Sequence, residues 1–237
     1  MSEVQMRQII LDTETTGLDP ATGDRLVEIA CVETINTVPT GEHFHVYIDP
    51  QRDVPDEAFR VHGLSTEFLK GKPLFDQIAD DFLTFIGDAP LVIHNAEFDM
   101  RFINSELQRS GRSPIPMDRV IDTLAMARRK HPGSPASLDA LCSRYRIDNS
   151  RRVKHGALLD AELLAEVYAE LSGGRQAALV LASDVKIVKH VEAVDVRPRP
   201  QPLAPLIAMD EETAHRSFIG TMGEKAVWLK YMATSEN

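Results

Sequence analysis

Hydrophobic and polar positions follow two different periods along the chain, and the change between them separates strands from helices. Three early apolar segments are short, rich in β-branched residues and bounded by turn residues, which is typical of strands. They are Ile9–Asp12, Leu26–Glu33 and His43–Ile48. The short links between them, at Gly23–Asp24 and Pro39–Gly41, predict an antiparallel meander.

Later in the chain the apolar residues recur every three or four positions, which predicts helices. The expected helices cover Leu74–Ile86, Phe98–Arg109, Ala157–Leu171 and a segment that Ser137 caps at its N-terminus, and the expected strands between them are Leu91–His94 and Val120–Asp122. Strands that come first and then alternate with helices indicate an α/β protein whose mixed sheet carries helices on its faces.

The pattern changes again after the last of these helices, which ends at Gly173–Gly174. Residues 175–208 have no sustained period and include the proline-rich RPRPQPLAP, which favours an extended linker. Residues 209–237 then offer a short helix and the strand-like AVWLKY, which contains the single tryptophan. We therefore expect a domain over residues 1–174, a linker over 175–208 and a tail over 209–237.

Composition narrows the class of protein. The formal net charge of −10 arises entirely before Ser172, because the residues from Ser172 onward carry eight basic and eight acidic side chains. A domain with this much negative charge is poorly suited to bind tightly along a nucleic acid, although it can still contact the end of a nucleic-acid chain through metal ions. The two cysteines form no CxxC pair, and there is neither a signal pattern nor an apolar run near 18 residues. We therefore expect a cytoplasmic protein without a membrane span.

Two acidic side chains stand at the end of the first apolar strand. Asp12 and Glu14 follow Ile10 on one side of this strand, and Ile9 and Leu11 on the other side are also apolar. The strand is therefore expected to be central and covered on both faces, where adjacent carboxylates repel each other and are costly to desolvate. The alternative is that the strand ends at Asp12 and that DTETTG is a solvated turn.

Two further acids occupy inward-facing helical positions. Asp99 lies one turn before Phe102, and Asp160 shares a helix face with Leu164. A single inward aspartate can be a satisfied polar group of the core, but two of them together with the strand pair indicate a shared counter-charge. Oxygen ligands without cysteine favour Mg²⁺ or Mn²⁺ over zinc.

Four carboxylates around two such ions are a recurrent solution for phosphodiester hydrolysis. This chemistry also needs a base for the attacking water. His155 lies five residues before Asp160, at the start of the same predicted helix, and is the candidate, although it could also be an ordinary surface histidine.

The segments DTETTG, HNAEFD and HGALLDA resemble the three motifs of the DEDDh exonucleases in order and spacing. The resemblance extends from Arg7 to Gly174 and is strongest to the proofreading members that serve bacterial replicative DNA polymerases. It implies a ribonuclease-H-like fold, removal of nucleotides one at a time from a DNA 3′ end, and release of 5′-mononucleotides. It also implies that Asp12, Glu14, Asp99 and Asp160 bind two divalent ions and that His155 is the general base.

The resemblance further implies a set of substrate contacts. These are Thr13, Thr15, Gly17, Leu18, Glu57, His62 and Asn95, with His94 in a supporting position. Gly17 would keep side-chain bulk away from the terminal nucleotide, and Leu18 would press against the last bases.

The same resemblance implies partners for the C-terminal region. The tail would dock on the polymerase catalytic subunit, with Phe218 and Trp228 as anchors. A segment with Gln176, Leu179 and Leu181 loosely resembles a sliding-clamp-binding peptide.

Two other functions remain open on the sequence alone. One is a free-standing exoribonuclease of the same family that trims RNA 3′ ends. The other is an inactive module that bridges clamp and polymerase, although such a module has no use for four buried acids.

Overall fold

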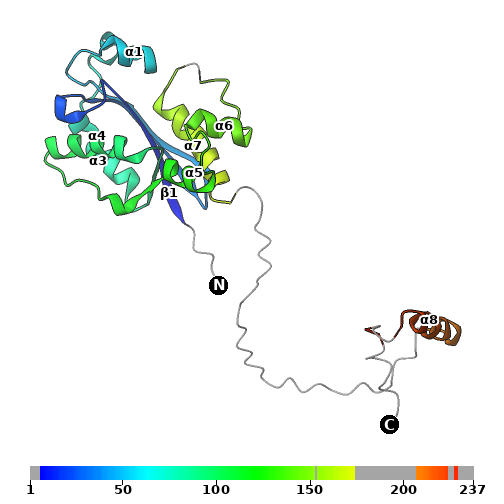
Figure 1. Cartoon of the computed structure of the whole chain (residues 1–237). Helices are drawn as coiled ribbons and strands as arrows, with labels where there is room; N and C mark the ends of the chain where they lie inside the picture. The colour runs from blue at the N-terminus through cyan, green and yellow to red at the C-terminus, as the bar shows by residue number, and fades with distance from the viewer. Residues whose placement is uncertain (1–5, 153, 174–206, 224–226, 229–237) are drawn as a thin grey trace, which may run out of the picture. The chain divides into compact units, whose positions relative to one another are not determined.

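The computed structural model describes residues 6–152, 154–173, 207–223 and 227–228. The described residues before residue 182 belong to one unit and those after it to a second. The first unit contains one sheet of five strands in the order β3-β2-β1-β4-β5 (Figure 1). The strands are β1 (Arg7–Thr15), β2 (Leu26–Ile35), β3 (Val38–Tyr47), β4 (Leu91–Ile93) and β5 (Val120–Asp122).

Seven α-helices belong to the first described unit and one to the second. They are α1 (Asp56–His62), α2 (Thr66–Leu69), α3 (Phe75–Ile86), α4 (Ala96–Arg109), α5 (Thr123–Lys130), α6 (Leu138–Tyr145), α7 (Ala157–Leu171) and, in the second unit, α8 (Met209–Thr221). Two single 3₁₀ turns, η1 (Pro20–Thr22) and η2 (Met117–Arg119), complete the described elements.

The sheet is mixed, as the sequence predicts. Strands β1, β2 and β3 pair antiparallel, whereas β4 and β5 run parallel to β1. The carboxyl ends of β1 and β4 therefore lie at the same edge of the sheet. This places Asp12 and Glu14 beside the start of α4, which follows β4 directly.

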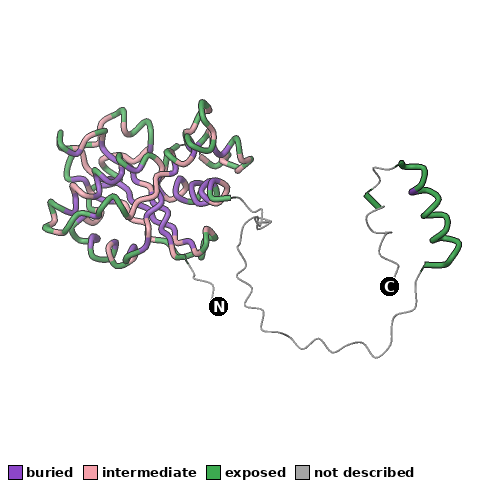
Figure 2. The backbone as a smooth tube through the Cα atoms, turned by 60° about the horizontal axis from the view of Figure 1, so that its bottom comes forward, coloured by how far each residue is buried: buried purple, intermediate pink, exposed green. Residues whose placement is uncertain are grey.

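Each face of the sheet carries its own core. Ile9 and Leu11 of β1 pack with α3 and α4 on one face, and Ile10 packs with α5, α6 and α7 on the other. The two cysteines are buried, one in each core. Figure 2 shows buried residues running through the sheet, with exposed residues on the outer helices. The central strand is thus held from both sides, which is what its unbroken apolar sequence predicts.

The predicted link at Pro39–Gly41 is wrong, because Pro39 and Gly41 lie within β3. The chain instead turns at Asn36 and Thr37, whose φ angles are +52° and +67°. Two consecutive positive φ angles suit the right-handed twist of a hairpin. A proline is tolerated in β3 because this strand is at the edge of the sheet.

Other predicted boundaries also change. The sequence did not indicate α1, α2 or α5, and β1 extends past Asp12 to Thr15, so the solvated-turn alternative for DTETTG is wrong. In the strand-like AVWLKY, Val227 and Trp228 lie in a turn, and the residues after them fall outside the described part of the chain. Residues 175–206 also fall outside it, so the domain boundary near residue 174 stays a prediction. No helix within the described ranges is long and apolar enough to cross a membrane.

Candidate active site

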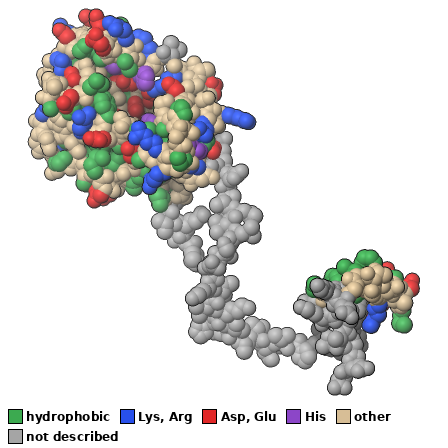
Figure 3. All heavy atoms as spheres, viewed as in Figure 1, with side chains coloured by type: hydrophobic (Ala, Val, Ile, Leu, Met, Phe, Trp, Pro, Cys, Tyr) green, Lys and Arg blue, Asp and Glu red, His purple; other side chains and the backbone are tan. Residues whose placement is uncertain are grey.

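A cleft of about 1000 Å³ opens at the carboxyl ends of β1 and β4, between α1, α4 and the start of α7. Figure 3 shows acidic and histidine side chains gathered in this hollow. Every site residue that the sequence predicts in the first 174 positions lines it. These residues are Asp12, Thr13, Glu14, Thr15, Gly17, Leu18, Glu57, His62, His94, Asn95, Asp99, His155 and Asp160.

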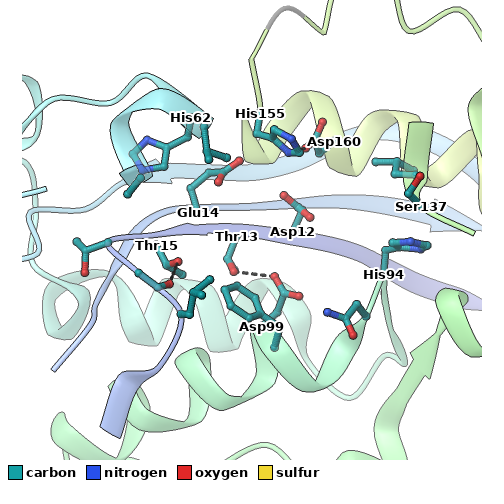
Figure 4. A pocket seen from close by; sticks show the side chains of 18 of the residues that line it. Asp12, Thr13, Glu14, Thr15, His62, His94, Asp99, Ser137, His155 and Asp160 are labelled. Carbon is teal, nitrogen blue, oxygen red and sulfur yellow. Dashed lines mark hydrogen bonds and ion pairs between the residues drawn. The ribbon is translucent and has the colours of Figure 1, made fainter. Parts of the chain in front are cut away.

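The first two acids come from β1. Asp12 and Glu14 lie on the side of the strand that faces the cleft, as their spacing predicts (Figure 4). Burial raises the pKa of Glu14 to about 8, helped by the carboxylates of Glu28 and Asp160. Burial and the neighbouring acids, Asp99 first, likewise raise the pKa of Asp12 well above its usual value. Both carboxyl groups are therefore harder to ionise than usual, and a nearby cation would favour their ionised forms.

The third acid lies in the first turn of α4. Asp99 is 4% exposed, and its Oδ1 accepts a hydrogen bond of 2.7 Å from the hydroxyl of Thr13. Burial raises the pKa of Asp99 to about 7, although this hydrogen bond works in the opposite direction. Thr13 thus holds Asp99 in place from β1, the strand that carries two of the other three metal-ligand candidates.

The fourth acid and the histidine belong to the start of α7. Asp160 is 3% exposed, and His155 precedes the helix with its Nδ1 3.2 Å from Asp160 Oδ2. The side chain of Arg152 contacts Asp160 through two nitrogens, Nε to Oδ1 at 2.5 Å and Nη2 to Oδ2 at 2.7 Å. A buried carboxylate without a bound ion needs such a partner.

The residues fit a divalent ion. Candidate ligand atoms of Glu14, His155 and Asp160 lie within 4.8 Å of one another. Asp12 and Asp99 lie outside this group of three but close to it, since the carboxylates of Asp99, Glu14 and Asp160 all raise the pKa of Asp12. Carboxylate oxygens with at most one imidazole are the donor set that Mg²⁺ and Mn²⁺ accept.

Sequence reasoning missed several residues at and around the cleft, among them two charged side chains that interact with the predicted acids. Glu28 on β2 pairs with Glu14 in the β1–β2 register, is 3% exposed, and accepts a hydrogen bond of 3.2 Å from the backbone N–H of Ala157. It thereby ties the start of α7 to the sheet, and its other oxygen lies 2.7 Å from His45 Nε2. Arg152 is the second of these charged side chains. Glu28 could have been found by the signal that marks Asp12, an acid inside an apolar strand.

Other predicted contacts line the wall of the cleft. His62 Nδ1 accepts a hydrogen bond of 3.0 Å from Leu64 N–H, so a neutral ring carries its proton on Nε2. This Nε2 is buried and has no hydrogen-bond partner among the described residues. Burial also lowers the pKa of His62.

Gly17 and Leu18 form the lip of the same cleft. Leu18 is 78% exposed, and its predicted contact with the substrate stays a prediction. A Cβ at Gly17 would lie 2.3 Å from the carboxylate of Asp24, so a larger residue here would displace the Asp24 side chain. Packing around Asp24 therefore favours glycine at this position independently of any nucleotide.

Comparison with known proteins identifies the family. The profile of the exonuclease family, RNase_T, matches residues 9–168. The chain belongs to this family. It is a 3′→5′ exonuclease.

The exonuclease also has similar relatives over most of its length. It is 51% identical to a Rickettsia conorii protein named DNA polymerase III subunit epsilon, over 90% of this chain and 95% of that one. The protein of the same name from Escherichia coli is 50% identical over 74% of this chain and 75% of that one.

Solved structures agree on the fold. The structure titled Exonuclease X in complex with 5′ overhanging duplex DNA is 25% identical, has a TM-score of 0.54, and is matched over 69% of this chain and 90% of that chain. The nuclease domain of 3′hExo, a DEDDh family member bound to rAMP, is 18% identical, has a TM-score of 0.62, and is matched over 73% and 94%. At that identity the second likeness concerns the fold alone.

Proposed function

We propose that this exonuclease is the proofreading subunit of a bacterial DNA polymerase III and removes mispaired nucleotides from a DNA 3′ end. The observation that carries the proposal is the convergence of four carboxylates from β1, α4 and α7 on one cleft. The relatives named DNA polymerase III subunit epsilon support DNA rather than RNA as the substrate.

The residues that would hold two divalent ions, Mg²⁺ or Mn²⁺, are Asp12, Glu14, Asp99 and Asp160. Such ions, when bound, activate water and compensate charge on the phosphodiester. His155 is the proposed base, and its 48% exposed side chain can reach a water in the cleft. The backbone N–H of His155 donates to the carbonyl of Val61 at 3.2 Å, so α1 helps to position the base.

The substrate contacts follow from the cleft wall. Thr13, Thr15 and Gly17 bring their backbone to the terminal nucleotide. The remaining proposed contacts are Leu18, Glu57, His62 and Asn95, with His94 as a supporting residue. His94 Nδ1 lies 2.9 Å from the hydroxyl of Thr123, which anchors the ring and agrees with support rather than chemistry.

Selectivity for mismatches follows from weak intrinsic binding. An acidic domain does not hold duplex DNA strongly, and a mispaired terminus unstacks at a smaller cost than a paired one. A frayed end therefore reaches the cleft more often than a matched end does.

Nuclease assays test the active-site assignment. The purified chain with Mg²⁺ and a 3′-mismatched primer should release 5′-mononucleotides, faster from DNA than from an RNA end of the same sequence. The double variant Asp12→Ala/Glu14→Ala should be inactive, and His155→Ala should lose about 10²–10⁴-fold in turnover. His43→Ala, at an exposed histidine of β3, is the matched control. An unaffected rate in the double variant would refute the metal assignment.

The C-terminal tail is the proposed polymerase-binding element. In the second unit Phe218 is 63% and Trp228 53% exposed, and the rings of His215 and Trp228 meet edge to face with centroids 5.8 Å apart. Exposed aromatic side chains are typical anchors of small interfaces. A tether of this kind replaces intrinsic affinity for DNA by a high local concentration.

A pull-down tests the tail. Phe218→Ala/Trp228→Ala should abolish co-purification with a polymerase III catalytic subunit while the nuclease rate stays unchanged. Met209→Ala is the matched control, because Met209 is 84% exposed and, nine positions from Phe218, lies on the opposite side of α8. Retention of the polymerase by the double variant would refute the proposed anchors. The clamp contact at Gln176, Leu179 and Leu181 lies outside the described residues and stays a proposal of the sequence.

A further inference from the structure

Arg152 is a buried cation in the middle of the acidic cluster, and the chemistry proposed above does not use it. Its side chain is 8% exposed and lies in the segment between α6 and α7. It donates to both oxygens of Asp160, and its Nη1 lies 2.8 Å from Asp139 Oδ2 on α6. Its charge also lowers the pKa of Asp12 and Glu14, against the raising effects of burial and of the other acids.

The position of one guanidinium nitrogen is informative. Arg152 Nη2 lies 2.7 Å from Asp160 Oδ2 and 2.7 Å from His155 Nδ1. Asp160 and His155 are two of the three residues whose candidate ligand atoms lie within 4.8 Å of one another. A nitrogen hydrogen-bonded to Asp160 Oδ2 cannot remain there beside a dication that Asp160 binds, because the two positive centres would compete for the same oxygen and repel each other.

We propose, on the basis of the proposed function, that Arg152 is an internal counter-ion that occupies the position of the metal in the metal-free enzyme and is displaced when a divalent ion binds. Arg152 is then a positioning residue, and it has two opposite effects. It stabilises the fold without metal, and it lowers the affinity for metal because the ion must first break two charge-assisted hydrogen bonds.

The same contact keeps the base inactive. A guanidinium only donates, so at 2.7 Å from Arg152 the Nδ1 of His155 must accept. A neutral imidazole then carries its proton on Nε2 and has no free lone pair for a water. Displacement of Arg152 by the ion frees Nδ1, so the base becomes available only when the site is loaded.

Metal titration of the full-length chain tests the proposal. Mn²⁺ binding is measured by calorimetry after removal of bound metal with EDTA and dialysis, for the unmodified chain and for Arg152→Gln. A hydrogen bond to a charged group contributes a free energy that corresponds to about 10- to 100-fold in an equilibrium constant. Because the ion no longer has to break these bonds, Arg152→Gln should bind Mn²⁺ at least about tenfold more tightly. Its Tm should fall in EDTA and match that of the unmodified chain at saturating Mn²⁺. Equal or weaker Mn²⁺ binding would overturn the proposal.

Three further variants sharpen the result. Arg151→Gln is the matched control, since the Arg151 side chain is 76% exposed and its Nη2 lies 4.0 Å from Glu162 Oε2. This variant should bind Mn²⁺ like the unmodified chain. Arg152→Lys keeps the positive charge but loses the paired hydrogen bonds, so it should also bind Mn²⁺ more tightly than the unmodified chain. If only Arg152→Gln binds more tightly, the net charge and not the hydrogen-bonded guanidinium is responsible, and the proposal fails. Asp139→Asn frees Nη1 without touching Asp160, and should give a smaller gain even if Arg152→Gln does not fold.

A second measurement does not involve metal. In EDTA, nitrogen NMR of the imidazole should find His155 with its proton on Nε2, and a proton on Nδ1 directed to Asp160 would overturn the proposal. These readouts separate the proposal from the proposed function. Loss of nuclease activity in all forms, with the expected Mn²⁺ affinities intact, would refute only the function, whereas normal activity with unchanged Mn²⁺ affinity in Arg152→Gln would refute only the role of Arg152.

Discussion

Replacement of Glu14 by glutamine should make the metal-free protein more stable while it impairs the site. Glu14 is 8% exposed at the end of β1, opposite Glu28 in the strand register. Glutamine has the same shape without the charge, so the change removes one member of a repelling cluster and leaves the packing intact.

The magnitude follows from the pKa. The carboxyl of Glu14 titrates at 4.5 in the unfolded chain and at about 8 in the folded one. Between these values the folded state holds a proton that the unfolded state has lost, so the free energy of unfolding decreases as pH rises and the loss is complete above about pH 8. At 1.36 kcal/mol per pKa unit, the ionised Glu14 side chain lowers the free energy of unfolding by at most about 5 kcal/mol. Because the open cleft admits water, which screens the charge, we expect a loss of about 2 kcal/mol.

Guanidinium denaturation in EDTA measures this difference. At pH 9, Glu14→Gln should exceed the unmodified protein by about 2 kcal/mol in free energy of unfolding, and at pH 5 most of the gain should vanish. Saturating Mn²⁺ should reverse the order, because the variant lacks a ligand. Glu42→Gln, at an exposed position of β3, is the control and should show no pH-dependent gain. A Glu14→Gln protein with no advantage at pH 9 would show that the cluster is not repulsive.

Three other outcomes follow from the same contacts. Mn²⁺ should raise the Tm of the unmodified chain relative to EDTA, and a Tm indifferent to both would contradict the metal site. Glu28→Leu should lower the free energy of unfolding by about 1–3 kcal/mol and slow the nuclease, because the backbone N–H of Ala157 loses its hydrogen-bond acceptor. An unchanged free energy of unfolding together with an unchanged nuclease rate would refute this role of Glu28. Glu106→Ala should cost about 3 kcal/mol in urea denaturation, because it leaves the buried side of Arg25 without the carboxylate that lies 2.5 Å from its Nε. Asp80→Ala, at an 81% exposed acid, should have a much smaller effect, and equal losses in the two variants would contradict this reasoning.

The sequence predicts the acids of the site because each breaks a local pattern. Asp12 and Glu14 continue an apolar strand, and Asp99 and Asp160 replace apolar residues on helix faces that the structure buries. Sheet order, in contrast, needs the pairing of distant strands. No local pattern records that β4 lies beside β1, and the strand order was not predicted.

The elements that the sequence missed are those whose structure depends on distant contacts. Helices α1 and α2 have seven and four residues, too few for a helical period to be recognised. Glu28 becomes part of the site only through the β1–β2 register, and Arg152 only through a non-helical segment that carries it to Asp160. For Glu28 and Arg152 the sequence gives the residue type, but it does not show which distant residues each one contacts.

The placement of the acids explains how the fold tolerates them. Asp12 and Glu14 belong to the central strand, which both cores hold through Ile9, Ile10 and Leu11. The repelling carboxylates therefore cannot move apart without breaking one of these cores, and their strain has to be relieved by a cation instead. Within the described residues, Arg152 supplies a partial relief, since it contacts only Asp160 among these acids. Because it pairs with one acid and compensates the others only in part, the metal-free enzyme stays folded and still retains a strong driving force for binding divalent ions.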